Sequence, residues 1–78
     1  MKIHDRTGKR VLKSVTLFLT PKEAAELSDS AAELAKNSQK HHHHISSEDY
    51  SSEITIAVYM PQNLSKFDEE SQKILKDS

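Results

Sequence analysis

The stretch VTLFLTPKEAAEL, residues 15–27, contains the boundary that decides the fold. Upstream of Thr20, apolar residues recur at every second position, which is typical of a β-strand with one apolar face. Extended back to Arg10, this alternation predicts a strand over residues 10–19. The more apolar face of that strand holds Val11, Val15, Leu17 and Leu19, together with Lys13.

Downstream, T20-P21-K22-E23 predicts the start of a helix. Thr20 can cap the helix, Pro21 suits the first helical position, and Glu23 can complete a capping box. We expect the helix to run from about Pro21 to about Asn37, because asparagine commonly ends helices. An apolar stripe continues at helical spacing over that range, formed by Ala24, Leu27, Ala31 and Leu34.

Three further elements are predicted on either side of this pair. D5-R6-T7-G8 is a turn sequence that could fold residues 2–4 back as a short edge strand. Residues 53–60 alternate in polarity and predict a second strand, which Pro61 ends. A short final helix is expected from Leu64 onwards, capped by Ser65 or Asp68.

Residues 41–46 begin with four consecutive histidines. We interpret them as a strand, with S47-E48-D49-Y50 as the turn of a hairpin. The alternative is a loop of about a dozen residues, which is long for a compact domain. Together the elements predict one small α+β domain over residues 1–78, in the order β-α-β-β-α. We expect a mainly antiparallel sheet of two to four strands, backed by one main helix and a short C-terminal helix.

The small size of the chain favours assembly. A chain of 78 residues buries only about 60% of its unfolded surface. There is no cysteine, so neither disulfides nor thiolate ligands can add stability. A small sheet also leaves open edges, which another chain can pair with. We therefore expect a homodimer.

The sequence contains no apolar run of the roughly 18 residues that a membrane span requires. No apolar core of a signal peptide follows Met1. The absence of cysteine suits a reducing compartment. We accordingly expect a cytoplasmic protein with no membrane partner.

Charge is unevenly distributed along the chain. Residues 1–22 carry six cationic side chains against Asp5, a net charge of +5, whereas the remainder carries a net charge of −6. The basic stretch suggests a nucleic-acid contact through Arg6, Lys9, Arg10 and Lys13. We do not favour nucleic acid as the partner, because the sequence pI is only about 6.5.

The histidine run is the strongest functional candidate. Imidazoles donate and accept hydrogen bonds, and when protonated they attract anions. We predict that this region engages a partner protein or a small anionic, nucleotide-like ligand. The predicted contact residues are His41, His42, His43, His44, Ser46 and Tyr50. The simplest alternative is a solvated polar segment with no ligand.

A transition-metal site is a further alternative. In a strand, His42 and His44 share one face and could bind Zn, Ni or Cu, while His41 and His43 share the other face. Glu48 or Asp49 could add a carboxylate, or a symmetric dimer could supply two histidine pairs. No HExxH sequence or second ligand cluster strengthens this interpretation.

Catalytic motifs are absent from the sequence. No serine lies in a G-x-S-x-G context, and a single glycine cannot form a phosphate-binding glycine loop. We therefore favour a small binding or regulatory protein, and rank below it a small enzyme in which a histidine at a dimer interface acts as acid or base.

Overall fold

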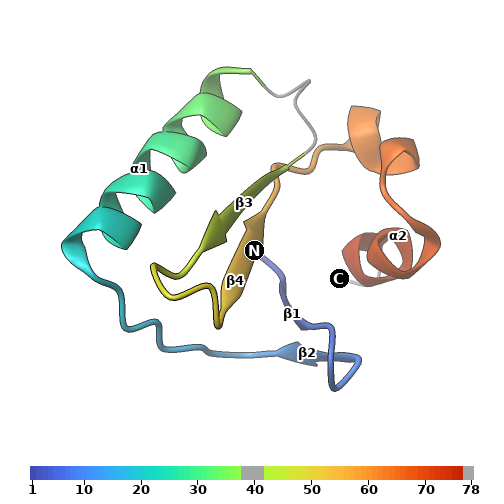
Figure 1. Cartoon of the computed structure of the whole chain (residues 1–78). Coiled ribbons are helices and arrows are strands. Elements are labelled where there is room, and N and C mark those ends of the chain that lie inside the picture. Colours follow the sequence, from blue (N-terminus) through green and yellow to red (C-terminus); the bar gives the residue numbers. More distant parts are fainter. Residues whose placement is uncertain (38–41, 77–78) are drawn as a thin grey trace.

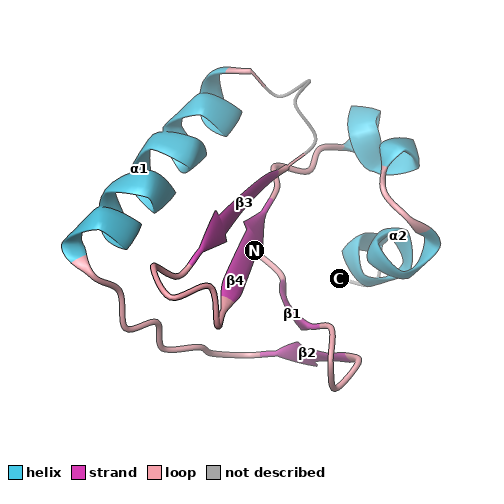
Figure 2. Cartoon of the chain, in the orientation of Figure 1, coloured by secondary structure: helices cyan, strands magenta, loops and turns pink. Residues whose placement is uncertain are grey.

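A computed structural model describes residues 1–37 and 42–76 (Figures 1 and 2). It confirms a small α+β fold with a main helix and a short C-terminal helix. The elements are β1 (Ile3–Asp5), β2 (Arg10–Leu12), α1 (Pro21–Lys36), β3 (His43–Ser46), β4 (Glu53–Ile56), η1 (Pro61–Lys66) and α2 (Glu69–Lys76). The strands form two separate antiparallel pairs, β1–β2 and β3–β4. None of the helices in the described part is long and apolar enough to cross a membrane.

The N-terminal hairpin confirms the turn predicted at residues 5–8. Strand β1 pairs with β2 in the register Ile3↔Leu12 and Asp5↔Arg10. The carboxylate of Asp5 accepts a hydrogen bond from the Gly8 amide at 3.1 Å. A Cβ on Gly8 would lie 2.6 Å from Oδ2 of Asp5, so a larger residue there would displace the Asp5 carboxylate.

The strand predicted over residues 10–19 is shorter in the structure and ends at Leu12. A strand is defined by the neighbour that it pairs with, and β1 has only three residues. Residues 13–20 continue to α1 outside any strand. The strand predicted over residues 53–60 begins at Glu53 as expected but is also shorter, because β4 ends at Ile56. Ile56 lies opposite His43, the first residue of β3, so the strand ends where its partner strand begins.

Helix α1 begins as its sequence predicts. The Thr20 hydroxyl accepts from the Glu23 amide at 3.2 Å, and the Glu23 carboxylate accepts from the Thr20 amide at 2.8 Å. These two bonds complete the expected capping box. At the other end, the Asn37 amide donates to the Glu33 carbonyl at 2.9 Å, so Asn37 ends the helix as expected.

The core lies between α1 and β3. Leu34 of α1 is 1% exposed and Ile45 of β3 is 3% exposed. The chain exposes 6236 Å², whereas the size scaling for compact monomers gives about 4,800 Å² at this mass. Its radius of gyration is 13.1 Å, compared with about 11.5 Å for a compact domain of this length. The chain is therefore less compact than a typical monomer of this size, and large apolar side chains such as Val15, Leu17 and Phe18 stay exposed.

The C-terminal region differs from the prediction of one helix from Leu64. The turn expected at Pro61 is the start of the 3-10 helix η1, and α2 begins only at Glu69. Asn63 is buried and closes this turn, because its side chain accepts from the Met60 amide at 2.8 Å and donates to the Val58 carbonyl at 3.0 Å. Asp68 then caps α2 by accepting from the Ser71 amide at 2.9 Å, as predicted for one of the two candidates.

Candidate functional site

Strand β3 separates the histidines onto two faces. The rings of His42 and His44 lie edge to face, with centroids 4.7 Å apart. His43 points the other way, and its Nε2 lies 3.5 Å from Oε2 of Glu33 on α1. This arrangement follows from the alternation of side chains along a strand. His41 lies outside the described residues.

His44 is held by the neighbouring strand. It lies opposite Thr55 in the β3–β4 register, and its Nδ1 is 2.9 Å from the Thr55 hydroxyl. The same nitrogen lies 2.6 Å from Oε1 of Glu53. Because a carboxylate only accepts hydrogen bonds, we assign a proton to Nδ1 of His44, which then donates to Glu53. Glu53 and Thr55 were missed by the sequence analysis, although the hairpin register would have placed them.

His42 and His44 line an open hollow of about 1350 Å³. Its walls come from parts of the chain that are distant in sequence, namely β1, the β3–β4 hairpin and the region of η1 and α2. Representative lining residues are His4, His42, His44, Thr55, Phe67 and Leu75. Of the other predicted contact residues, Ser46 and Tyr50 do not line this hollow.

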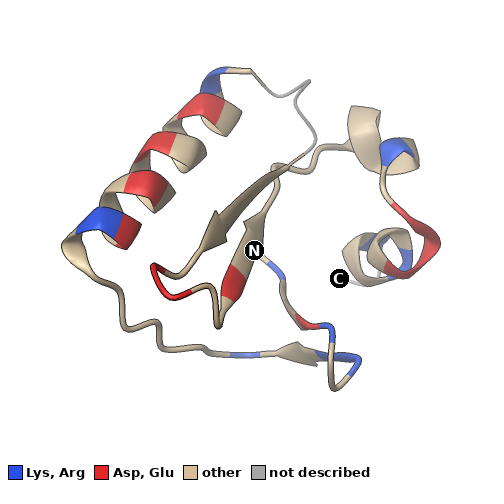
Figure 3. Cartoon of the chain, viewed as in Figure 1, with Lys and Arg blue, Asp and Glu red and all other residues tan. Residues whose placement is uncertain are grey.

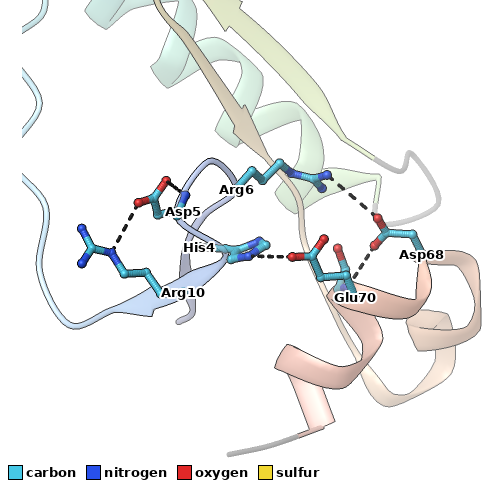
Figure 4. A network of polar contacts seen from close by, with 8 residues as sticks. His4, Asp5, Arg6, Arg10, Asp68 and Glu70 are labelled. Atoms are coloured by element: carbon cyan, nitrogen blue, oxygen red, sulfur yellow. Dashed lines mark hydrogen bonds and ion pairs between the residues drawn. The ribbon is translucent and has the colours of Figure 1, made fainter.

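Ion pairs join β1 and its turn to the start of α2 along one side of the hollow (Figure 4). His4 Nε2 lies 3.3 Å from Oε1 of Glu70, and Nη1 of Arg6 lies 3.9 Å from Oδ2 of Asp68. The hydrogen bonds from Ser71, with the Arg6 charge nearby, lower the pKa of Asp68. The positive charge of Arg6 on this wall therefore already faces a carboxylate.

The basic residues suggested for nucleic acid are also partly paired. Arg10 Nε lies 3.5 Å from Oδ2 of Asp5, in addition to the Arg6–Asp68 contact. A hydrogen bond from the Gly8 amide, aided by the Arg10 charge, lowers the pKa of Asp5. Lys9 and Lys13 are exposed. Figure 3 shows that these cations follow the N-terminal hairpin, while carboxylates line α1 and the β3–β4 turn.

No cluster of three histidine, aspartate or glutamate side chains within residues 1–37 and 42–76 is arranged to hold a metal ion. The carboxylate beside His44 is Glu53 rather than Glu48 or Asp49. Glu48 belongs to the β3–β4 turn and lies beside the start of α1, since its amide donates to Oε2 of Glu23 at 2.7 Å. The two-histidine set of His42 and His44 therefore lacks the carboxylate that the sequence suggested for it.

Glu23 has a structural role that its place in the capping box did not reveal. One carboxylate oxygen accepts from the Thr20 amide and the other from the Glu48 amide. The bond from Glu48 ties the start of α1 to the β3–β4 turn. Both bonds lower the pKa of Glu23, with the Thr20 amide as the larger cause, and the residue is only 8% exposed.

Asp49 organises the turn that carries Tyr50. Its Oδ1 accepts from the hydroxyls of Ser47 and Ser51, both at 2.7 Å, and from the Ser51 amide at 3.0 Å. The hydrogen bonds from Ser47 and Ser51 lower the pKa of Asp49 to about 2. The conformation of the turn therefore depends on an ionised carboxylate.

We expect this dependence to appear as a loss of stability in acid. The ordinary pKa of Asp49 is 3.8, and its folded value is about 2. A carboxyl with a lowered folded pKa stabilises the fold above its unfolded pKa, and this stabilisation is lost as the pH falls toward the folded pKa. The urea midpoint should decline between about pH 5 and pH 2, and less steeply in Asp49→Asn. Asp29→Asn, on the exposed surface of α1, is the control, and an equal slope in the two variants would contradict the assignment.

Tyr50 has a backbone that tyrosine rarely adopts. Its φ is 59°, in the left-handed region, and its side chain is 85% exposed. Asparagine tolerates this region, so Tyr50→Asn is expected to raise the free energy of unfolding by about 0.5–1 kcal/mol. Urea denaturation measures this change. Tyr50→Phe retains the ring and the left-handed backbone, so it should leave stability unchanged. If Tyr50→Asn were instead less stable than the wild type, the backbone of Tyr50 would not be strained.

Comparison of the chain with protein-family models, with curated proteins and with solved structures gives no match. Function therefore has to be inferred from the residues that meet at the hollow.

Proposed function

We propose that this chain is a small homodimeric binding protein that holds a segment of a partner protein in the hollow beside His42 and His44. The observation that supports this proposal is the hollow itself, because three separate parts of the chain contribute to it and none of them fills it. Its volume of about 1350 Å³ exceeds the roughly 300–1,000 Å³ that is usual for small-molecule sites.

The lining favours a protein segment over a small anion. Apolar groups from Ala57, Tyr59 and Phe67 contribute to the hollow alongside the polar side chains. The guanidinium of Arg6 and the imidazole of His44 each have a carboxylate beside them. A phosphate would meet those carboxylates, whereas a peptide can place apolar side chains on the floor and hydrogen-bond to the imidazoles.

Photo-crosslinking tests the hollow. A photoreactive amino acid at Ala57, which lines the hollow, should yield a covalent protein adduct in cells of the source organism. The same group at Ser28, exposed on α1, should not. Replacing both His42 and His44 with alanine should reduce the Ala57 adduct by about tenfold, the loss expected when about 1.4 kcal/mol of binding is removed.

His43→Ala is the matched control, since it removes the same side chain from the opposite face of β3. Equal adducts from Ala57 and Ser28, or no adduct at all, would overturn the proposed site. So would an adduct that persists unchanged in the His42 and His44 variant. Thermal denaturation of each variant establishes that the comparison is made between folded proteins.

Native mass spectrometry of untagged protein tests the homodimer. The protein should be purified without metal resin, because four consecutive histidines bind nickel resin whatever their role. A dimer without added mass supports the proposal. A retained organic mass would favour the anionic ligand, stoichiometric zinc, nickel or copper would favour a metal held between two copies, and a monomer would refute the homodimer.

A further inference from the structure

Residues 14–19 form an extended, mainly apolar segment that the rest of the described chain leaves unpaired. The segment runs from β2 to α1 without folding back (Figure 1). Within the described part of the protein its backbone makes no hydrogen bond. Both of its faces bear exposed apolar side chains, with Val15 52%, Leu17 47% and Phe18 92% exposed. Such a segment offers a complete strand edge together with apolar surface.

The surface of the chain has room for a partner of this kind. The exposed area of 6236 Å² exceeds that of a compact monomer of this mass by about 1,400 Å². A standard dimer covers about 800 Å² on each partner. One interface of ordinary size along the segment would therefore account for more than half of the excess.

The charges around the segment favour a second copy in the antiparallel sense. The segment itself is uncharged, so two copies can meet at a two-fold axis without like-charge repulsion. Arg10 and Lys13 precede it, and α1 follows it, with Lys22 in the first turn and the carboxylates Glu26 and Asp29 beyond (Figure 3). Antiparallel pairing brings Arg10 and Lys13 of each copy toward α1 of the other, where Glu26 and Asp29 outnumber Lys22, whereas parallel pairing places Arg10 and Lys13 of the two copies side by side.

We propose that residues 14–19 of two copies pair as antiparallel strands about a two-fold axis, so that each copy supplies the neighbouring strand that the other lacks. This proposal rests on the homodimer of the proposed function, and it identifies the surface that makes it. Opposed Cα atoms in such a pair are about 4.5–5.5 Å apart, which falls within the range that a disulfide bridges.

A cysteine scan tests the pairing directly, because the natural chain has no cysteine. Single cysteines are placed in turn at residues 14–19 of the full-length chain, with Ser28→Cys on α1 as the exposed control. Under mild oxidation, a covalent dimer should form fastest at the residue on the axis and more slowly on either side of it. The maximum rate should exceed that of Ser28→Cys by at least about tenfold, because pairing raises the local thiol concentration.

A second pair of variants tests the backbone. Thr16→Pro removes an amide donor and should convert the dimer to a monomer in analytical ultracentrifugation, with the helical circular dichroism retained. Thr16→Val keeps the donor and should remain dimeric. A wild-type dimer with no rate maximum within residues 14–19 would overturn this interface but leave the homodimer standing. A wild-type monomer would overturn this interface and the homodimer, whereas the binding site at the hollow is tested separately by the crosslinking at Ala57.

Discussion

Replacing Leu34 with alanine is expected to unfold most of the protein near physiological temperature. Leu34 is 1% exposed, and the only other apolar side chain in the described part that reaches full burial is Ile45. Truncating a buried leucine costs about 2–5 kcal/mol. A domain of this size has a total stability of only about 3–5 kcal/mol from its core. Loss of this one side chain therefore removes a large share of the stability.

Circular dichroism during heating measures this effect. A loss of this size corresponds to a fall in Tm of more than about 10 °C in a small domain. Leu27→Ala is the matched control, because Leu27 lies on the same helix and is only half-buried. Its effect should be clearly smaller. If Leu34→Ala kept its Tm within a few degrees of the wild type, the contact between α1 and β3 would not be the core.

Replacing Glu23 with glutamine should be the most damaging polar substitution. Both oxygens of Glu23 accept from backbone amides, those of Thr20 and Glu48. Glutamine has a single acceptor oxygen, so one of the two amides would face an NH₂ donor instead. Because that amide lies in partly buried surroundings, its loss of a partner is costly. We expect the hairpin turn to separate from the start of α1.

Comparison with Thr20→Ala distinguishes the two roles of Glu23. Thr20→Ala removes only the hydroxyl half of the capping box and should cost about 1 kcal/mol. Glu23→Gln should lower the urea midpoint further and increase hydrogen exchange at the Glu48 amide, which Thr20→Ala should leave protected. Because the folded pKa of Glu23 is lowered, this stabilisation is present above the ordinary glutamate pKa of 4.5, and the wild type should lose it as the pH falls through the lower folded pKa. Unchanged exchange at Glu48 in the glutamine variant would show that the bond between α1 and the turn is not significant.

The local elements were predictable because neighbouring residues create them. Thr20, Pro21 and Glu23 lie within one turn and bond to one another, so the start of α1 could be predicted from the sequence. The same holds for Asp5 and Gly8 in the first turn, and for Asp68 at the start of α2. In each case the partner lies three residues away, and no distant segment is needed.

The candidate site was predictable only in part. Strand alternation separates His42 and His44 from His43, and the structure shows that separation. Nothing in the histidine run indicates that Glu53 and Thr55 hold His44, because that contact depends on the hairpin register. The hollow also required β1 and α2 to come together, through contacts such as that between His4 and Glu70.

The sequence by itself determined the α+β class, the start of α1, the two hairpin turns and the faces of the histidines, and it offered the cap of α2 as one of two candidates. These follow from periodicity and from bonds across a few residues. Only the tertiary structure decided where the strands end, where α2 begins, which carboxylate faces His43 and His44, and that residues 14–19 have no paired strand in the described part of the chain. The physical reason is that a strand, unlike a helix, takes its hydrogen bonds from another segment. The alternation of residues 10–19 therefore specifies a strand edge without specifying which chain completes it.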